Sequence, residues 1–484
     1  MMTNETHIGT EHAEPGHLSW LRVRAFSCAD ALLARPEGAL AQPCADEIRH
    51  TLFRLLKETA LPALDVLYYN GELGSDEELP YCMEERIKKA CPRLMALIRQ
   101  TESDFCDSLA EALWRVAEYR AEIGTTLLQG RIFRQITGLE FGAGDRHNGG
   151  RCVIIFTTDA GKFVYKPHTL AADRIVRHLA EGFFPGLFYV PQVVCGKNFG
   201  FCEFVENRPA ATDRAARLYY YRLGGFCAVS RMLGAADLHR ENMLSHDAVP
   251  VPVDFETAFS PVLRRSIDEN AQRELADTLH ASCLLPTQVN EQECSFLFDT
   301  SDQNVSAPVV DGERKTLGYY LDDFLRGFRE TYRRGMAQRA ALLTFAERAE
   351  NFPVRIVLRS TAGYMKLLRR ARQWKWLCAP ELGNEVKRVL SLAVKDYVPA
   401  AGQAERETAA ILRCDVPYFT VDMDGHDLCD AGGIAEKACI DISPREHFIR
   451  CLRLLSEEDL AFHCRLFTEA VQQSGSTPPK PRET

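Results

Sequence analysis

The sequence has no run of about eighteen consecutive apolar residues, so it predicts no helix long enough to cross a bilayer. Its N-terminal stretch mixes His, Glu and Pro and has no apolar segment behind a basic start, which argues against an export signal. Basic residues are too few for a nucleic-acid surface, because 58 Lys and Arg stand against 67 Asp and Glu, giving a net charge of −9. We therefore expect a cytoplasmic protein with no membrane span and no nucleic-acid partner.

Closely spaced cysteine pairs are absent as well. The 17 cysteines are scattered along the chain, with no CxxC pair, and no His–Cys cluster stands out near the C-terminus. Thiols in this pattern are typical of buried, reduced side chains rather than of disulfides or metal ligands. We therefore expect no zinc.

What the chain does have is enough length and apolar content for folded domains. Of its 484 residues, 46% are hydrophobic. Helical periodicity dominates the first part, and a β-branched run at 153–156 marks a change of period. The sequence predicts an α+β protein in four regions: a helical N-terminal cap over 1–138, a small β-rich lobe over 139–210, a helix-rich lobe with the catalytic and metal loops over 211–473, and a disordered tail over 474–484.

The β-rich lobe is expected to hold a small sheet and one helix. Asp159-Ala160-Gly161 predicts a tight turn between two strands, and Gly196-Lys197-Asn198 separates two more within 191–205. Helical periodicity lies between them, and a polar loop at 237–242 and a short strand at 249–254 interrupt the helical pattern that follows. A sheet lobe followed by a helical lobe, with a polar loop between, is the order of a two-lobed kinase.

Three short segments carry the groups that phosphoryl transfer requires. Asp237 and Asn242 are five positions apart, the offset between the base and the magnesium-binding Asn in kinase catalytic loops. Asp254 follows an apolar strand and precedes Phe255, as the metal-binding Asp of a kinase does. Lys166 ends the second strand of the hairpin, where a lysine can bind ATP phosphates. Each segment alone is common, and their order along the chain makes the prediction.

A set of longer motifs resembles one family. They are GDRHNGGR at 144–151, VYKP at 164–167, DLHREN at 237–242, VDFET at 253–257, RIVLRSTAGY at 355–364 and DVPYF at 415–419. Together they are similar to the dehydratase domain of class II lanthipeptide synthetases, the LanM type. The resemblance implies a lipid-kinase-like fold and a precursor peptide as substrate, with a leader and a Ser/Thr-rich core. It also implies a two-step reaction, in which ATP with Mg²⁺ phosphorylates Ser or Thr and the phosphate is then eliminated to leave dehydroalanine or dehydrobutyrine.

The same resemblance implies roles for individual residues. Lys166 would bind ATP, and Asn242, Asp254 and Glu256 would bind magnesium, although Glu256 could instead hold a neighbouring loop. The catalytic residues would be Asp237 and His239 for phosphorylation, Asp145 and His147 from the glycine-rich segment, and Arg355 and Thr361 for elimination. Arg355 and Thr361 are six positions apart, so on an unbroken helix they would not share a face.

Several alternatives stay open on the sequence alone. Arg359 could form a structural salt bridge, and the 415–419 segment could be a turn or the entry to a strand. The chain could be a kinase without the elimination step, or a non-catalytic peptide-binding scaffold. No LanM-type cyclase motif is found, so we expect a dehydratase without its own cyclase, which would need a separate cyclase to form rings.

Overall fold

The computed structural model describes residues 15–34, 40–73, 79–142, 145–264, 276–285, 295, 297–299, 301, 303–378, 381–392 and 400–474, apart from the side chains of 79–81, 361 and 362. The segment expected to form a disordered tail lies, after Ser474, outside the described residues. Helices and mainly antiparallel strands make up the described part, in agreement with the α+β class. Within it, no helix combines the length and apolarity needed to cross a membrane.

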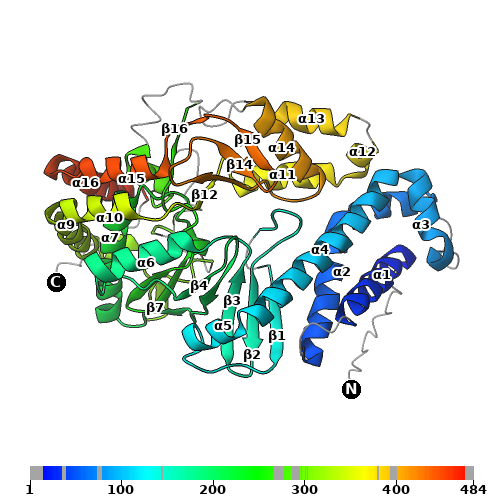
Figure 1. Ribbon diagram of the computed structural model, residues 1–484, viewed down its shortest axis with the longest axis horizontal. Helices are drawn as coiled ribbons and strands as arrows, with labels where there is room; N and C mark the ends of the chain where they lie inside the picture. Colours follow the sequence, from blue (N-terminus) through cyan, green and yellow to red (C-terminus); the bar gives the residue numbers. More distant parts are fainter. Residues whose placement is uncertain are drawn as a thin grey trace, which may run out of the picture.

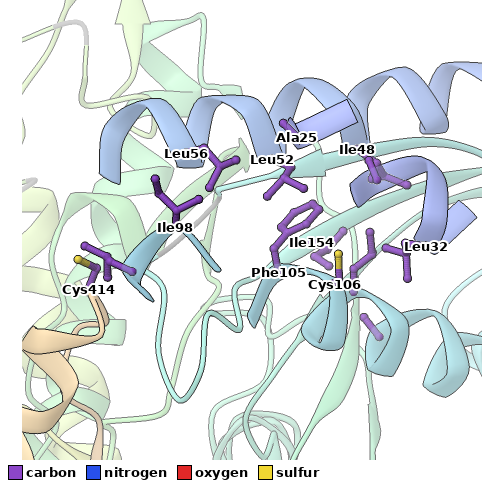
Figure 2. Close-up of a cluster of buried hydrophobic side chains, with 14 of the residues drawn as sticks. Ala25, Leu32, Ile48, Leu52, Leu56, Ile98, Phe105, Cys106, Ile154 and Cys414 are labelled. Carbon is purple, nitrogen blue, oxygen red and sulfur yellow. The ribbon is translucent and has the colours of Figure 1, made fainter. Parts of the chain in front are cut away.

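The described N-terminal region contains the helices α1 (Gly16–Leu33), α2 (Gln42–Tyr69), α3 (Leu79–Ala90), α4 (Pro92–Glu118) and α5 (Arg120–Thr126). In Figure 1, α1, α2 and α3 lie at the right, and α4 runs from them toward α5 at the bottom centre. Their apolar faces pack on the first sheet rather than forming a separate core. Figure 2 shows Leu52 and Phe105 of these helices beside Ile154 of that sheet. The helices of the region predicted over 1–138 extend to Thr126, and the first strand begins at Ile136.

The first sheet has five antiparallel strands in the order β1-β2-β3-β5-β4. Their bounds are β1 Ile136–Phe141, β2 Ile154–Thr158, β3 Gly161–Lys166, β4 Val193–Cys195 and β5 Gly200–Glu203, and α6 (Ala171–Phe183) follows β3. The predicted hairpin, helix and strand pair are confirmed. Gly161 turns the hairpin with φ +139°, a left-handed conformation that favours glycine. The sheet ends its third strand at Lys166, which brings that lysine to the lobe's edge.

A second apolar cluster surrounds α7 (Asp213–Leu233) and α9 (Leu321–Ala337). These helices cross closely because Gly224 and Gly327 face each other's backbone, where a Cβ atom on either would overlap a carbonyl of the other helix. Three more helices lie around them: α10 (Arg339–Arg348), α15 (Pro444–Arg453) and α16 (Glu457–Gln473), with the 3-10 helices η2 (Leu279–Ser282) and η3 (Leu317–Tyr319). Two small sheets complete this part of the chain. One consists of β6 (Arg208–Pro209), β7 (Met243–Asp247) and β8 (Val249–Pro252), and the other of β10 (Val309–Val310) and β11 (Glu313–Arg314).

The region expected to be one helix-rich lobe contains a further sheet in the order β12-β13-β14-β15. Its strands are Pro353–Ile356, Phe419–Asp422, Leu428–Asp430 and Gly433–Glu436, and β9 (Val262–Leu263) pairs with β16 (Ile440–Ile442). Between β12 and β13 the chain forms α11 (Thr361–Ala371), α12 (Trp374–Leu377), α13 (Leu382–Leu390) and α14 (Ala401–Leu412). These helices share the apolar cluster of the N-terminal helices, beside which they lie in Figure 1. Part of the predicted third region thus packs with the first.

A buried ion pair holds this excursion together. Arg359 Nε donates to Glu407 Oε1 at 2.9 Å, and Tyr364 Oη donates to the same oxygen at 2.6 Å. The Glu407 side chain is 0% exposed and that of Arg359 is 10% exposed. The structural interpretation of Arg359 is therefore confirmed.

Removing the arginine should measurably weaken the fold. We expect Arg359→Ala to lower the free energy of unfolding by about 3–5 kcal/mol, because Glu407 would be left charged and buried without its partner. The change can be measured by urea denaturation. Arg174→Ala, which breaks an exposed Arg–Glu pair with Glu350, is the matched control and should change stability by less than about 1 kcal/mol. Equal effects of the two substitutions would contradict the prediction.

Candidate functional site

Lys166 and Asp254, which are far apart in the sequence, meet at the edge of the first sheet. Lys166 Nζ donates to the carbonyl oxygen of Val253 at 2.6 Å and lies 3.4 Å from Asp254 Oδ2. The lysine is only 5% exposed. Burial works to lower its pKa, but the charges of Asp254 and Asp173 outweigh burial and raise it. Lys166 therefore stays positively charged inside the protein.

Asp173, which was not singled out in the sequence, lies beside this pair. Lys166, Asp254 and Asp173 are called the first charged group below. It lies in the first turn of α6 and is 4% exposed. Its Oδ2 is buried and has no hydrogen-bond partner among the described residues. Burial raises the pKa of this carboxyl, and the charge of Lys166 opposes the shift. An acidic residue in the first turn of a helix directly after the lysine strand was the only signal available in the sequence.

The polar loop from Asp237 to Asn242 follows the end of α7. Asp237 has φ +56°, and its backbone carbonyl accepts a hydrogen bond from Asn242 Nδ2 at 3.0 Å. The Asn242 carbonyl in turn accepts from the Val253 N–H at 3.1 Å, which ties the loop to the segment carrying Asp254. The structure thus brings together the three residues whose spacing predicted a phosphoryl-transfer site.

The environment of Asp237 in this loop bears on proton transfer, whereas His239 makes structural contacts. Burial raises the pKa of the Asp237 carboxyl, although His239 and Arg355 oppose the shift. His239 Nδ1 accepts a hydrogen bond from the Glu241 N–H at 3.3 Å, which caps the 3-10 helix η1 (Arg240–Asn242). The observed contacts of His239 therefore brace the loop.

A second charged group lies beside the first and is centred on Glu256. Arg355 of β12 donates from a guanidinium nitrogen to Glu256 Oε1, and its backbone N–H donates to the Glu256 carbonyl at 2.9 Å. Tyr418 Oη donates to Glu256 Oε2 at 3.0 Å, and the Arg355 guanidinium lies 5.0 Å from the centre of the Tyr418 ring. Burial would raise the pKa of Glu256, but Arg355 and His168 lower it, so the carboxylate stays ionised.

His147 joins this second group in a defined orientation. Its Nδ1 donates to the Val416 carbonyl at 2.9 Å, and Nε2 lies 3.5 Å from Arg355 Nη2. Burial first, and then the charge of Arg355, lower the pKa of His147, whereas Asp145 works in the opposite direction. The ring is therefore neutral near pH 7, and its unprotonated Nε2 faces the arginine.

The glycine-rich segment and the 415–419 segment hold each other in place. The N–H groups of Gly149 and Gly150, both at positive φ, donate to the Asp415 carboxylate at 2.6 and 3.2 Å. β13 begins at the last residue of this segment, Phe419, so the strand-entry interpretation is confirmed. The sequence analysis did not foresee that Tyr418 would reach Glu256, because that contact spans two distant parts of the chain.

Arg355 and Thr361 do not lie on one unbroken helix, the arrangement that was considered for them in the sequence. Arg355 lies on β12, which ends at Ile356, and Thr361 begins α11, so the intervening residues break any common helix. The six-residue spacing therefore does not keep the two apart. The side chain of Thr361 and the backbone of Gly144 lie outside the described residues.

Oxygen ligands for a cation are gathered where the two charged groups meet. Ligand atoms of His168, Asp254 and Glu256 all lie within 4.8 Å of one another. Both Glu256 oxygens already accept hydrogen bonds from Arg355 and Tyr418, so this residue bridges the groups in the observed arrangement. Asp254 and Asn242 offer the hard oxygens that Mg²⁺ prefers, and the amide nitrogen of Asn242 is held by Asp237, which leaves the amide oxygen for a cation.

Comparison with known proteins gives one matching family. The family model described as "Domain of unknown function (DUF4135)" matches residues 91–306 and 297–422, more than half of the chain. The chain belongs to this family. The matched region contains every candidate site residue named above, from Asp145 to Tyr418.

One curated relative extends this result. The lacticin 481/lactococcin biosynthesis protein LcnDR2 of Lactococcus lactis subsp. lactis is 23% identical over 384 residues, which cover 68% of this chain and 40% of the relative. The chain thus spans about two fifths of the length of that protein. Together with the family match, this confirms the resemblance to LanM-type dehydratases seen in the sequence.

Proposed function

We propose that this protein of lanthipeptide biosynthesis phosphorylates Ser and Thr of a precursor peptide and then eliminates the phosphate. The observation that carries the proposal is the contact between two charged groups through one short segment. Asp254 lies beside Lys166, and Glu256, two residues later, binds Arg355. A substrate side chain could thus be phosphorylated at one group and lose phosphate at the other without leaving the site.

The first group fits the phosphorylation step. ATP with its Mg²⁺ supplies the phosphoryl group when bound, and Lys166, Asn242 and Asp254 are the residues that would hold them. Asp237 would accept the proton of the Ser or Thr hydroxyl. At the same time the hydroxyl oxygen would bond to the γ-phosphorus of ATP, and the bond between that phosphorus and ADP would break. The raised pKa of Asp237 suits this role, because a general base is most effective with a pKa near the working pH. With this assignment we also propose the kinase-like fold that the sequence predicts.

The second group fits the elimination step. A base must remove the α-proton of the phosphorylated residue while the C–O bond breaks and a C–C double bond forms. His147 is neutral, and its Nε2 is unprotonated, so it can take that proton. Arg355 would stabilise the charge that develops on the enolate and on the departing phosphate. Asp145 and Thr361 are proposed to assist, as the family motif implies.

Asp173 should affect the reaction through Lys166. In Asp173→Asn the lysine loses one of its two neighbouring carboxylates, so its ammonium group is held less firmly against the phosphates. We expect kcat/KM for ATP to fall by about tenfold to a hundredfold, the size expected when a binding group is misplaced. ATP consumption in the presence of peptide measures this effect.

Asp213→Asn is the matched control for this experiment, because Asp213 also lies in the first turn of a helix but is remote from Lys166 and more than half exposed. It should leave kcat/KM for ATP unchanged. An unaffected Asp173→Asn variant would show that Asp254 alone positions the lysine.

The proposed function can be tested by mass spectrometry. A candidate precursor peptide, with leader and Ser/Thr-rich core, is incubated with the protein, ATP and Mg²⁺. Loss of one water at each modified Ser or Thr supports a dehydratase, whereas a stable gain of a phosphoryl group would reduce the protein to a kinase. An unchanged peptide, with ATP not consumed, would support the scaffold alternative. A separate cyclase added afterwards would reveal whether the dehydrated residues form rings.

A further inference from the structure

A cluster of potential metal ligands lies outside the candidate site, at the end of α7. Asp277, His447 and Cys451 each offer one ligand atom, and these atoms lie within 4.8 Å of one another. His447 and Cys451 are four positions apart on α15, and Asp277 precedes η2. The Cys451 residue is 0% exposed, and the His447 and Asp277 side chains are 1% and 13% exposed.

The histidine is oriented as a metal ligand is. His447 Nδ1 donates to the Ser260 carbonyl at 2.5 Å, which leaves Nε2 as the ring nitrogen that faces the cluster. A hydrogen bond from the second ring nitrogen to a backbone carbonyl is the usual support of a metal-bound histidine. Nε2 contacts both Cys451 and Asp277, and a metal ion bound between the three residues would replace these two contacts.

The distances match the edges of a zinc coordination shell. His447 Nε2 lies 3.5 Å from Cys451 Sγ and 3.6 Å from Asp277 Oδ1. Zinc binds nitrogen and oxygen at about 2.0–2.2 Å and sulfur at about 2.3 Å in a tetrahedron, so its ligands lie about 3.3–3.6 Å apart. The two separations from His447 Nε2 therefore match those that a single zinc ion would impose, and the third lies within 4.8 Å.

Neighbouring residues hold Asp277 and His447 in place. Arg450 forms three hydrogen bonds of 2.6–3.0 Å to the two Asp277 oxygens and fixes that carboxylate. Gly234, the left-handed residue that ends α7, packs so closely that a Cβ there would lie 2.7 Å from His447 Cε1. The Gly234 carbonyl also accepts from the Ser260 N–H at 3.2 Å. The cluster thus joins α15 to the end of α7, three residues before Asp237.

We propose that Asp277, His447 and Cys451 bind one Zn²⁺ ion, with a water molecule in the fourth position. Binding releases the Cys451 thiol proton to solvent and forms three metal–ligand bonds, with no change of oxidation state. The ion would hold the start of the Asp237 loop against α15. The sequence analysis expected no zinc because it considered CxxC pairs and the C-terminal tail, whereas here Asp277 comes from a distant segment.

Metal analysis of the full-length chain tests the proposal without reference to its activity. The protein is stripped with a chelator, incubated with Zn²⁺, desalted, and its zinc content measured by mass spectrometry. We expect one zinc per chain in the wild type and in Cys227→Ser, a control that alters another fully buried cysteine, on α7. Cys451→Ser and His447→Asn should lose the stoichiometric zinc. Equal zinc in all four proteins would overturn the assignment of ligands.

A second measurement covers the case in which the variants fail to fold. Co²⁺ added to the stripped wild-type protein should produce the thiolate-to-cobalt charge-transfer band and the intense ligand-field bands of a tetrahedral site, and Zn²⁺ should abolish them. Absence of the thiolate band, with no retained zinc, would overturn the proposal. A proton shared between His447 and Cys451 would then be what holds the cluster together.

Discussion

Replacing Asp237 with asparagine is expected to leave the precursor peptide at its original mass. Asparagine keeps the size of the side chain and can keep the backbone bond from Asn242 Nδ2 to the residue 237 carbonyl, but it cannot accept the hydroxyl proton. Loss of a general base lowers a rate by about 10²- to 10⁴-fold. Neither phosphorylated nor dehydrated peptide should therefore accumulate within the time that the wild type needs for completion, as followed by mass spectrometry.

Asp247→Asn provides the matched control for this substitution. Asp247 also has a positive φ of +53°, close to the +56° of Asp237, but it lies at the exposed end of β7. Its replacement should leave peptide modification at the wild-type rate. Dehydration by the Asp237→Asn variant at that same rate would remove Asp237 from the proton-transfer role.

The pH dependence of the first step gives an independent check on Asp237. Burial raises the pKa of this carboxyl above its ordinary value. The residue is active as a base only when ionised, so phosphorylation should decrease as the pH falls through the raised pKa, and the decrease should begin at a higher pH than an exposed aspartate would give. Initial rates of phosphopeptide plus dehydrated peptide, measured against pH, test the direction of the shift.

Local patterns predicted the parts of the site that lie within short segments. The hairpin ending at Lys166 was recognisable from a β-branched run and a turn with Gly161, and the Asp237–Asn242 spacing identified the loop. Both signals are local, since a turn or a loop is encoded by residues that are neighbours in the chain. The structure places these groups together as the order of segments had suggested.

Contacts between distant segments could not be predicted in the same way. Tyr418 reaches Glu256 across 162 positions, and Asp277 reaches His447 across the chain between η2 and α15. No periodicity links such positions. For Arg355 and Thr361, the spacing argued against a shared site because it was judged on a continuous helix. In the structure a strand ends and a helix begins between the two residues, so that argument does not apply.

Arg355→Lys is expected to accumulate phosphorylated peptide. Lysine keeps one positive charge beside Glu256, so the buried carboxylate is not left unpaired, but it loses the planar guanidinium that contacts Glu256, Tyr418 and His147. The first charged group around Lys166 is unchanged, and phosphorylation should proceed. Elimination should slow by about 10²- to 10³-fold, the loss seen when one donor to a developing anion is removed.

The ratio of phosphorylated to dehydrated residues over time separates this effect from a general loss of activity. Arg174→Lys, which alters an exposed Arg–Glu pair, should give the wild-type ratio. His147→Asn should resemble Arg355→Lys if the neutral ring removes the α-proton, because its loss also leaves the Lys166 group intact. Unmodified peptide with Arg355→Lys would mean that Arg355 acts in phosphorylation, and that Glu256 links two parts of a single kinase site rather than two successive steps.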